Sequence, residues 1–147
     1  MTKTFKGRAI ISGDIQGDVM VSKEGLNPLA AWKDAILKKK KTAKCGDQNN
    51  KDLYKKQISN KIICLPQVIG STTAGIVIQT ALDMNIGPKA FLFSNHIDSL
   101  AASGILISDI WMDEKIITID QLGKEFLDYI QEGMNVQIKP DGTVIVD

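Results

Sequence analysis

The sequence has only two cysteines, one histidine and no long hydrophobic run. Cys45 and Cys64 are too few for a four-cysteine zinc site or a disulfide framework within the chain. No apolar run reaches the roughly 18 residues that a membrane-spanning helix needs. The first residues also lack the apolar block of a signal peptide. We therefore expect a cytoplasmic protein with no membrane among its partners.

An excess of charge of either sign is missing as well. The 147 residues contain 18 lysines and arginines and 17 acidic residues, so the net charge is +1. This balance implies no electrostatic attraction of the whole protein to nucleic acid or to an anionic membrane. Hydrophobic residues make up 44% of the chain, which is enough to fill one core. We therefore expect a single domain over residues 1–147 and no nucleic acid among its partners.

Strand and helix patterns alternate through the middle of the chain. Residues 61–65 (KIICL) and 89–93 (KAFLF) are typical of short buried strands, and residues 74–85 between them follow helical spacing. The pattern continues with a helix at 97–103 that ends at Gly104 and with strands at 105–108 and 115–119. Strands that alternate with helices pair in parallel through right-handed crossovers. The middle of the chain therefore predicts a parallel sheet.

The two ends of the chain add β structure of another kind. Arg8–Ser12 and Asp18–Val21 are β-prone runs whose connection is bounded by glycines, which predicts a hairpin or a corner. Pro140-Asp141-Gly142 is a hairpin turn signal between runs at 135–138 and 143–146. We expect an α/β domain with a mainly parallel central sheet and β-hairpin ends.

Two further helices and one loop complete the pattern. A short helix follows Leu26-Asn27-Pro28, and its apolar positions are Leu29, Trp32, Ile36 and Leu37. A last helix over residues 121–131 is capped by Asp120, and its apolar stripe is Leu122, Phe126, Leu127 and Ile130. Residues 45–56 are polar and rich in turn-forming types, which predicts a loop.

The segment Gly70-Ser71-Thr72-Thr73 is the most informative for function. It lies where a buried strand ends and a helix begins, and ligands of parallel α/β sheets bind beyond the carboxyl ends of the strands. The unpaired N–H groups of a helix N-terminus suit a carboxylate or phosphate, which the hydroxyl of Ser71 could reach. The alternative is that Ser71 or Thr72 only caps the helix. The segment is neither a Walker A loop nor a nucleophile elbow, because it lacks their lysine and G-x-S-x-G patterns.

The histidine and the cysteines give weaker signals. His96 follows the strand at 89–93 and could approach Ser71, although a single loop histidine is typical of a surface or hydrogen-bonding position. Cys45 could ligate a metal cluster only with ligands from another chain. Cys64 lies inside an apolar run, which is typical of core packing.

The polar segment after the first helix gives two further candidates. Asp47, Gln48 and Asn49 could hydrogen-bond a polar substrate, or they could simply form turns. The four lysines at 38–41 could form a patch for a partner or a phosphate, although such a run is more typical of a solvated surface.

A set of segments in order along the chain supports a more specific interpretation. The segments are Lys6-Gly7-Arg8-Ala9, Gly13, Gly17, Val19-Met20-Val21-Ser22, residues 60–66 leading to Gly70-Ser71-Thr72, Ile86-Gly87-Pro88-Lys89-Ala90, and Gly133 to Asp147. Together they resemble the small swivelling domain of the aconitase X family over almost the whole chain. No single motif is diagnostic, but the predicted β-α-β order agrees with that family.

The resemblance implies the small subunit of a hydro-lyase that removes water from a hydroxy acid. It implies that Ser71 is the general base. Gly70, Thr72 and Thr73 would bind the substrate carboxylate. Asp47, Gln48 and Asn49 would contact the substrate or the partner. It also implies a heterodimer in which a large subunit holds an iron or iron–sulfur centre and this chain binds no cofactor. For the substrate we expect cis-3-hydroxy-L-proline first and phosphomevalonate second.

One region departs from the family pattern. Many members carry a Gly-Gly-Val-Asp-Pro stretch, then an aspartate and a His-Pro-Leu step. Residues 26–54 contain neither motif. Asp47 could stand for the family aspartate and Leu53 for the leucine, but the His-Pro pair is missing. The absence of the His-Pro pair supports an alternative function, a non-catalytic binding or regulatory module on the same fold. A phosphohistidine carrier built on His96 is disfavoured, because Ser94-Asn95-His96 lacks the threonine–histidine context of such carriers.

Overall fold

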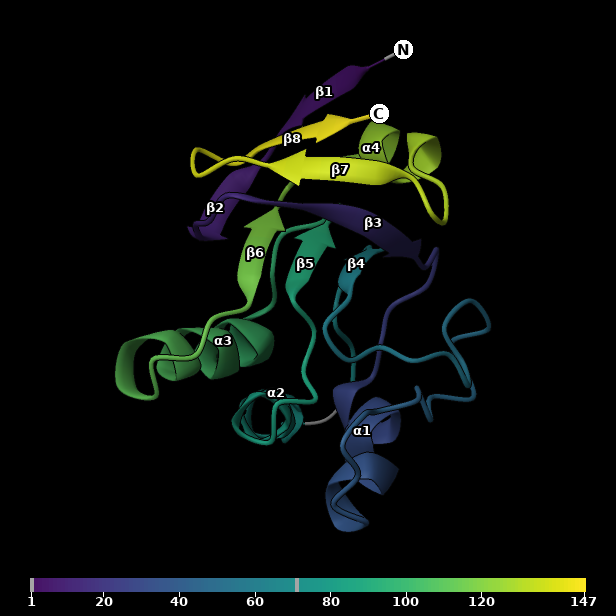
Figure 1. Cartoon of the computed structure of the whole chain (residues 1–147), viewed down its shortest axis with the longest axis vertical. Helices are drawn as coiled ribbons and strands as arrows, with labels where there is room; N and C mark the ends of the chain where they lie inside the picture. Colours follow the sequence, from purple (N-terminus) through teal and green to yellow (C-terminus); the bar gives the residue numbers. More distant parts are fainter. Residues whose placement is uncertain (1, 71) are drawn as a thin grey trace.

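Three parallel strands form the centre of the sheet: β4 (Ile62–Leu65), β5 (Ala90–Phe93) and β6 (Ile117–Asp120). In the computed structural model, which describes residues 2–70 and 72–147, they belong to an eight-stranded sheet of order β1-β8-β7-β3-β4-β5-β6-β2. Figure 1 shows the three strands in the middle of the molecule, all pointing the same way. The predicted parallel sheet is confirmed.

The crossover helices lie together beside this sheet. α2 (Ala74–Asp83) joins β4 to β5 and α3 (Ser99–Trp111) joins β5 to β6, as parallel strands require. α1 (Pro28–Leu37) packs against α2, and the three helices occupy the lower part of Figure 1. Trp32 of α1 is fully buried and donates its indole N–H to the Ile86 carbonyl oxygen (3.0 Å). Among the described residues, no helix is long and apolar enough to cross a membrane.

Both faces of the central strands are buried, which explains why their sequences are apolar throughout. Ile63 and Leu65 of β4 belong to the core under the three helices. Ile62 and Cys64 point to the other side of the sheet and pack into a second core. Cys64 is therefore a core residue, as predicted.

Outside these three strands the pairing is antiparallel, except that the end of β3 pairs with β4 in parallel. β7 (Asn135–Ile138) and β8 (Thr143–Val146) form the hairpin that the turn signal predicted. β1 (Lys3–Lys6), which the sequence analysis missed, pairs with β8. β3 (Ile15–Val21) connects the two parts of the sheet, because its first residues pair with β7 and its last three pair with β4. The result is a parallel centre with antiparallel strands on both sides.

The chain turns a corner between β2 (Arg8–Ile11) and β3, so the hairpin alternative is wrong. β2 pairs with β6 at the far end of the sheet from β1. Gly13 lies directly over Ile117, and a Cβ at Gly13 would come within 2.4 Å of the Ile117 side chain. This close approach lets the chain cross the start of β6 instead of folding back on β2.

A single helix occupies the region where a helix at 97–103 and a strand at 105–108 were predicted, so that prediction is wrong. Asp98 caps α3, because its side chain accepts hydrogen bonds from two first-turn N–H groups. Gly104 lies inside the helix and allows it to approach α2 closely. The buried residues follow helical spacing: Ala101, Gly104, Ile105 and Ser108.

The last helix is shorter than predicted, and Asp120 does not cap it. α4 (Lys124–Tyr129) begins after Gly123, whereas Asp120 is the fully buried last residue of β6. The predicted apolar stripe is buried: Leu122, Phe126, Leu127 and Ile130.

The predicted apolar face of α1 is only partly correct. Leu29 and Leu37 are exposed. The helix instead buries Pro28, Ala31, Trp32 and Ala35. The two alanines are small, so this face of α1 lies close against the core.

Candidate functional site

The loops that follow β4, β5 and β6 meet at one edge of the sheet. Because these strands are parallel and adjacent, their carboxyl ends share that edge. Asn95 donates its backbone N–H to the Pro66 oxygen (3.2 Å), and Gln121 donates its own to the Asn95 oxygen (3.0 Å). These bonds tie the three loops together. The loop that contains residues 70–73 is therefore joined to the loop that carries His96.

Gly70 has a backbone conformation that favours glycine, with φ at +116°. A Cβ at this position would come within 2.8 Å of the Asn27 side chain. The residues before Gly70 are held to the chain ahead of α1: Leu26 donates its N–H to the Gln67 oxygen (3.1 Å), and Ile69 donates to the Leu26 oxygen (2.8 Å). These contacts fix the backbone immediately before residue 71 in the sequence.

The predicted base Ser71 lies outside the described residues, and the two threonines after it are exposed. Thr73 is the N-cap residue of α2, so a cap at Thr72 is wrong, whereas the capping alternative for Ser71 falls outside the described residues. The Thr73 backbone is helical (φ −83°, ψ −4°), and its side chain makes no capping hydrogen bond. The positive end of the α2 dipole therefore lies next to the segment 70–73.

Asp47 is buried and is brought close to Gly70 through Asn27. Its carboxylate accepts the backbone N–H groups of Asn27 (3.0 Å) and Asn49 (3.1 Å). The side chain of Asn27 in turn packs against Gly70 and caps α1. Asp47 therefore forms a turn and supports the site segment from behind, whereas Gln48 and Asn49 are exposed.

Asn50 is a structural residue that sequence reasoning missed. It is fully buried and donates its side-chain N–H to Ser22 Oγ (2.8 Å) and to the Gly25 oxygen (3.2 Å). Its side-chain oxygen accepts the N–H of Leu53 (3.0 Å). These bonds anchor the loop at 45–56 to the chain that leaves β3. Nothing in the sequence distinguishes Asn50 from the other amides of that loop.

Arg8, Asp120 and His96 form a cluster at the same edge of the sheet. The buried Asp120 carboxylate accepts Arg8 Nε on one oxygen (3.0 Å) and Arg8 Nη2 on the other (2.8 Å). It also accepts the backbone N–H of Ile97 (2.7 Å). The Arg8 side chain is 48% exposed, and its Nη1 makes no hydrogen bond to a described residue. One edge of the guanidinium is therefore held in place and the other edge is open.

His96 supports Arg8 in this cluster. Its Nδ1 lies 2.7 Å from the Ile97 carbonyl oxygen, and its Nε2 lies 3.3 Å from Arg8 Nη2. A carbonyl oxygen can only accept a hydrogen bond and a guanidinium can only donate one. Nδ1 of His96 therefore carries the proton, and Nε2 accepts from Arg8. The hydrogen-bonding interpretation of His96 is thus confirmed.

Opposing effects act on the Asp120 carboxyl. Burial raises the pKa of Asp120, but the hydrogen bonds from Arg8 and Ile97 and the charge of Arg8 outweigh burial and hold it below its usual value. The pKa of Arg8 is raised by its hydrogen bond to Asp120. Both groups are therefore charged at neutral pH.

The two cysteines lie apart from this edge as buried thiols. Burial raises the pKa of both Cys45 and Cys64, which keeps them in the protonated form. In the described part of the chain, no three His, Cys, Asp or Glu side chains come together as a metal-binding group.

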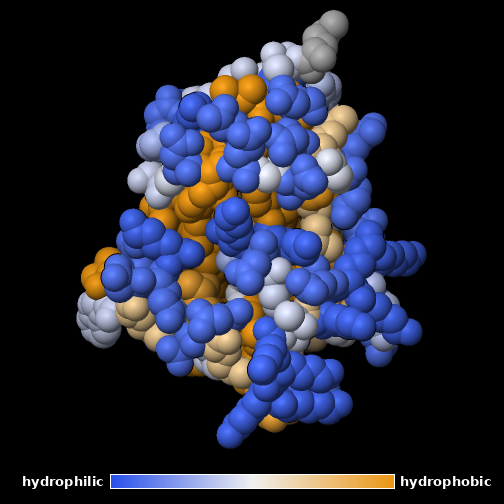
Figure 2. Space-filling view, viewed as in Figure 1, coloured by the Kyte–Doolittle hydropathy of each residue, from blue (hydrophilic) through white to orange (hydrophobic). Residues whose placement is uncertain are grey.

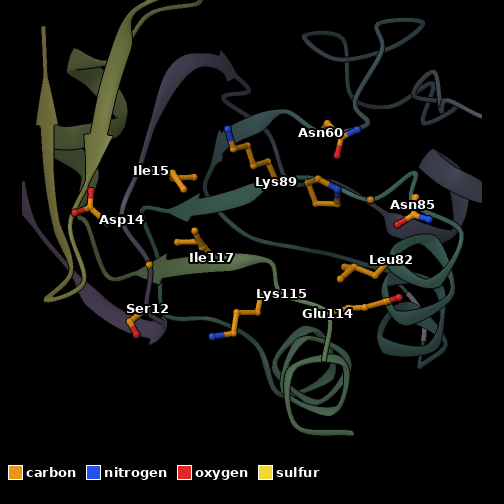
Figure 3. Close-up of a pocket in the computed structure, with 13 residues that line it drawn as sticks. Ser12, Asp14, Ile15, Asn60, Leu82, Asn85, Lys89, Glu114, Lys115 and Ile117 are labelled. Atoms are coloured by element: carbon orange, nitrogen blue, oxygen red, sulfur yellow. The ribbon is translucent and has the colours of Figure 1, made fainter. Parts of the chain in front are cut away.

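A hollow of about 540 Å³ lies at the opposite edge of the sheet, where β4, β5 and β6 begin. Figure 2 shows this face with an apolar floor between the sheet and the helices. In Figure 3 the side chains of Glu114 and Lys115 point in different directions from its rim, so the charged groups do not converge on one point. Burial and the charge of Asp83 raise the pKa of Glu114. We therefore place the candidate site at the carboxyl edge.

Comparisons with known proteins agree over nearly the full length of the chain. The aconitase X swivel domain family matches residues 4–146. The chain is 32% identical to the phosphomevalonate dehydratase small subunit of Thermococcus kodakarensis over 108 residues, which are 74% of this chain and 75% of that protein. It is 25% identical over 136 residues to the protein of the same name from Methanosarcina mazei, covering 91% of this chain and 83% of that protein.

Solved structures share the fold. The crystal structure of Thermococcus kodakaraensis aconitase X in its holo-form superposes with a TM-score of 0.81 at 27% identity, covering 99% of this chain and 98% of that one. The solution NMR structure of a UPF0107 protein superposes with a TM-score of 0.74 at 20% identity, covering 97% of each chain. The second likeness is one of fold alone.

Proposed function

This chain belongs to the aconitase X swivel domain family and is the small subunit of a dehydratase of that type, and we propose that it supplies Ser71 as general base for the dehydration of a phosphorylated hydroxy acid. The observation that carries this proposal is the meeting of the loops after β4, β5 and β6 at one edge, with Gly70 fixed just before Ser71 in the sequence. The swivelling fold expected from the resemblance is confirmed by the shared fold with aconitase X.

The proposed reaction needs a base on this side of the substrate. Ser71 takes a proton from the carbon next to the one that bears the hydroxyl group. The electron pair of that C–H bond becomes the new C=C bond. The C–O bond breaks, and the hydroxide that leaves becomes water with a proton from the solvent. A negatively charged serine oxygen is stabilised by the positive end of a helix dipole, which α2 provides after Thr73. Gly70, Thr72 and Thr73 hold the substrate carboxylate through N–H and hydroxyl groups.

The large subunit completes the site in this proposal. The donor set for an iron or iron–sulfur centre is not found among the described residues, since Cys45 and Cys64 are separately buried and no third ligand joins them. We assign the centre that the family resemblance implies to the large subunit. In this proposal Asp47 contacts neither substrate nor the large subunit. It supports the site from within this chain by accepting the backbone N–H of Asn27.

The substrate class rests on the relatives and on Arg8. Cis-3-hydroxy-L-proline was the first expectation from the sequence, but the names of both relatives favour phosphomevalonate. Asp120 and His96 orient Arg8 so that the Nη1 edge of its guanidinium is open beside the candidate site. A charged guanidinium whose Nη1 hydrogens are open suits a phosphate group, which accepts charge-assisted hydrogen bonds. Arg8 therefore binds the substrate phosphate in our proposal.

The role of Ser71 is tested in the assembled enzyme. The Ser71→Ala variant, combined with the large subunit, should lose turnover of phosphomevalonate by about a thousandfold, within the range for loss of a general base. Circular dichroism and assembly with the large subunit should not change. Ser12→Ala is the matched control, because Ser12 is an exposed serine at the opposite edge of the sheet. Turnover of the Ser71 variant within a few fold of the parent enzyme rejects the assigned role.

The role of Arg8 is tested with inorganic phosphate as a competitive inhibitor of the same complex. Arg8→Gln should raise the inhibition constant of phosphate and the KM for phosphomevalonate by at least about tenfold, since a charge-assisted hydrogen bond is lost. Lys6→Gln removes an exposed cation two residues away and should change neither constant. Unchanged phosphate inhibition in Arg8→Gln removes Arg8 from the proposal and leaves Ser71 untouched.

A further inference from the structure

Five large apolar side chains are exposed on the outer surfaces of two neighbouring helices. They are Ile76 of α2 and Leu106, Ile107, Ile110 and Trp111 of α3, and we term this surface the α2–α3 face. Trp111 is 82% exposed and Ile110 is 69% exposed, so these are side chains in full contact with water. Figure 2 shows apolar atoms at the left edge, where α3 ends in Figure 1. Clustered exposed apolar residues of this kind mark interaction surfaces.

α3 carries apolar side chains on two sides. Its buried stripe packs on the core, and a second stripe at helical spacing faces outward, formed by Ser103, Leu106, Ile107, Ile110 and Trp111. Asp109 is the only charged residue among its 13 residues, and Asp83 is the only one among the 10 residues of α2. A surface helix normally carries polar residues on the side that faces away from the core, so the exposed apolar residues of α3 need another explanation. Depletion of charge is also what distinguishes the centre of a protein interface.

The close packing of α2 and α3 joins their outer surfaces. A Cβ at Gly104 would lie 2.3 Å from the Gly75 oxygen, so the two backbones meet without side chains between them. Further along, Gln79 of α2 donates to the sulfur of Met112 just after α3 (3.1 Å). The two helices are therefore in contact at both points, which brings their exposed apolar side chains to neighbouring parts of the surface.

We propose that the α2–α3 face is the docking surface for the large subunit of the dehydratase. This inference rests on the proposed function, because the relatives of this chain are named as small subunits. One end of the face adjoins the candidate site, because α2 begins directly after residues 70–73 and Ile69, just before them, is also exposed (42%). α3 extends the face away from this edge, since it runs from the loop after β5 to the start of β6. A large subunit seated on this face reaches the edge of the sheet where it must complete the site. A second copy of this chain would cover the face without completing the site.

Trp111 gives a direct reporter of docking. The other tryptophan, Trp32, is fully buried and hydrogen-bonded, so its emission is a constant background. The exposed indole of Trp111 should emit at long wavelength in the free chain and shift to shorter wavelength when purified large subunit is added. The matching titration of Trp111→Phe should show no such shift from this chain. Absence of any shift in a complex that size-exclusion chromatography shows to be formed overturns the proposal.

Charge substitutions test the face without using turnover as the readout. Ile110→Glu and Ile76→Glu should each raise the dissociation constant of the large subunit by at least about a hundredfold, because each buries a carboxylate in the interface. Leu37→Glu is the matched control: Leu37 is exposed (71%) at the end of α1, outside the face, and its variant should bind normally. Circular dichroism of all three variants checks that the fold is kept.

The outcomes separate this inference from the proposed function. Normal binding by both Ile110→Glu and Ile76→Glu overturns the docking surface and leaves the role of Ser71 standing. Self-association of the free chain that these variants abolish, with unchanged binding of the large subunit, assigns the face to a second copy and also overturns the proposal. Loss of binding in the Ile variants together with full turnover in Ser71→Ala supports the docking surface and rejects the base.

Discussion

Gly75 and Gly104 face each other where α2 and α3 cross. The Gly75 backbone fills the space that a side chain at Gly104 would need, and the Leu100 carbonyl oxygen of α3 fills that space at Gly75. A Cβ at Gly104 would lie 2.3 Å from the Gly75 oxygen and 2.7 Å from its Cα. Because the clashing atoms belong to the backbone, rotation of a side chain cannot relieve the contact. The pair therefore sets how closely the two helices approach, and with it the width of the α2–α3 face.

Gly104→Ala should destabilise the protein in spite of the better helix propensity of alanine. The propensity gain in a helix is about 1 kcal/mol, and overpacking at a backbone contact costs about 3 kcal/mol or more. We expect a net loss of about 2 kcal/mol in the free energy of unfolding, measured by urea denaturation. Ser103→Ala, one residue earlier on the exposed side of α3, should leave stability nearly unchanged. A more stable Gly104→Ala variant would contradict the described contact.

Asp120→Asn should destabilise the protein by about 3 kcal/mol. Arg8 then loses its charged partner, and one accepting oxygen of the buried side chain is replaced by an NH₂ group that cannot accept a hydrogen bond. Asp128 is the matched control. It pairs with Lys124 on the exposed side of α4, and such surface pairs contribute little. Urea denaturation of Asp120→Asn and Asp128→Asn measures the difference. Equal stability of the two variants would show that the Asp120 pair is unimportant.

The hairpin between β7 and β8 should weaken in acid through Asp141. Hydrogen bonds from Thr143, together with Lys6, lower the pKa of Asp141 to about 2. The unfolded value is about 3.9, so the folded pKa is the lower of the two. The contribution of Asp141 is therefore complete above about pH 4 and is lost as the pH falls toward 2. The melting temperature of the parent protein should fall more steeply than that of Asp141→Asn over this interval. Parallel melting curves would contradict the lowered pKa.

Gly70→Ala should impair the enzyme more than a glycine substitution elsewhere. Both Gly70 (φ +116°) and Gly133 (φ +85°) have positive φ, so alanine is strained at either position by about 1 kcal/mol. Only at Gly70 would the added Cβ also meet Asn27, within 2.8 Å, whereas nothing lies within 4 Å at Gly133. We expect Gly70→Ala to lower turnover of the complex by at least about tenfold, in keeping with a small displacement at the site. Turnover of Gly133→Ala should be normal, and equal effects would reject this role of Gly70.

Both cysteines should resist thiol reagents in the folded protein. Cys45 is 2% exposed and Cys64 is fully buried, and burial raises the pKa of each thiol. Labelling with a thiol-reactive disulfide should be slow in buffer and should reach two thiols per chain in denaturant. Rapid labelling of Cys64 without denaturant would contradict its place in the core.

The centre of the fold could be predicted because its signals are local. The run KIICL is closed by Pro66, and the helix that follows is closed by Gly87-Pro88, so the boundaries of β4, α2 and β5 are marked in the sequence. The sequence could not distinguish the single helix α3 from a helix followed by a strand, because a glycine such as Gly104 often marks the end of a helix. Its true role depends on Gly75 in another helix, which no local pattern shows.

The candidate site could be predicted only where one segment contains it. The segment 70–73 is contiguous, so its place at the end of β4 follows from the pattern. Arg8 and Asp120 are separated by 112 positions and meet only because β2 pairs with β6 at the end of the sheet. The local sequence pattern therefore predicts a helix cap at Asp120, and it indicates only a strand at Arg8.

The pairing of β1 with β8 places Lys3 opposite Val146, so the two ends of the chain lie together, as Figure 1 shows. A short linker could join them into a closed ring, and new ends could then be opened in the exposed lysines at 38–41. Such a circular permutant keeps every strand pairing and both proposed surfaces. It also offers a way to attach a fluorophore or a purification tag beside α1 without touching the carboxyl edge.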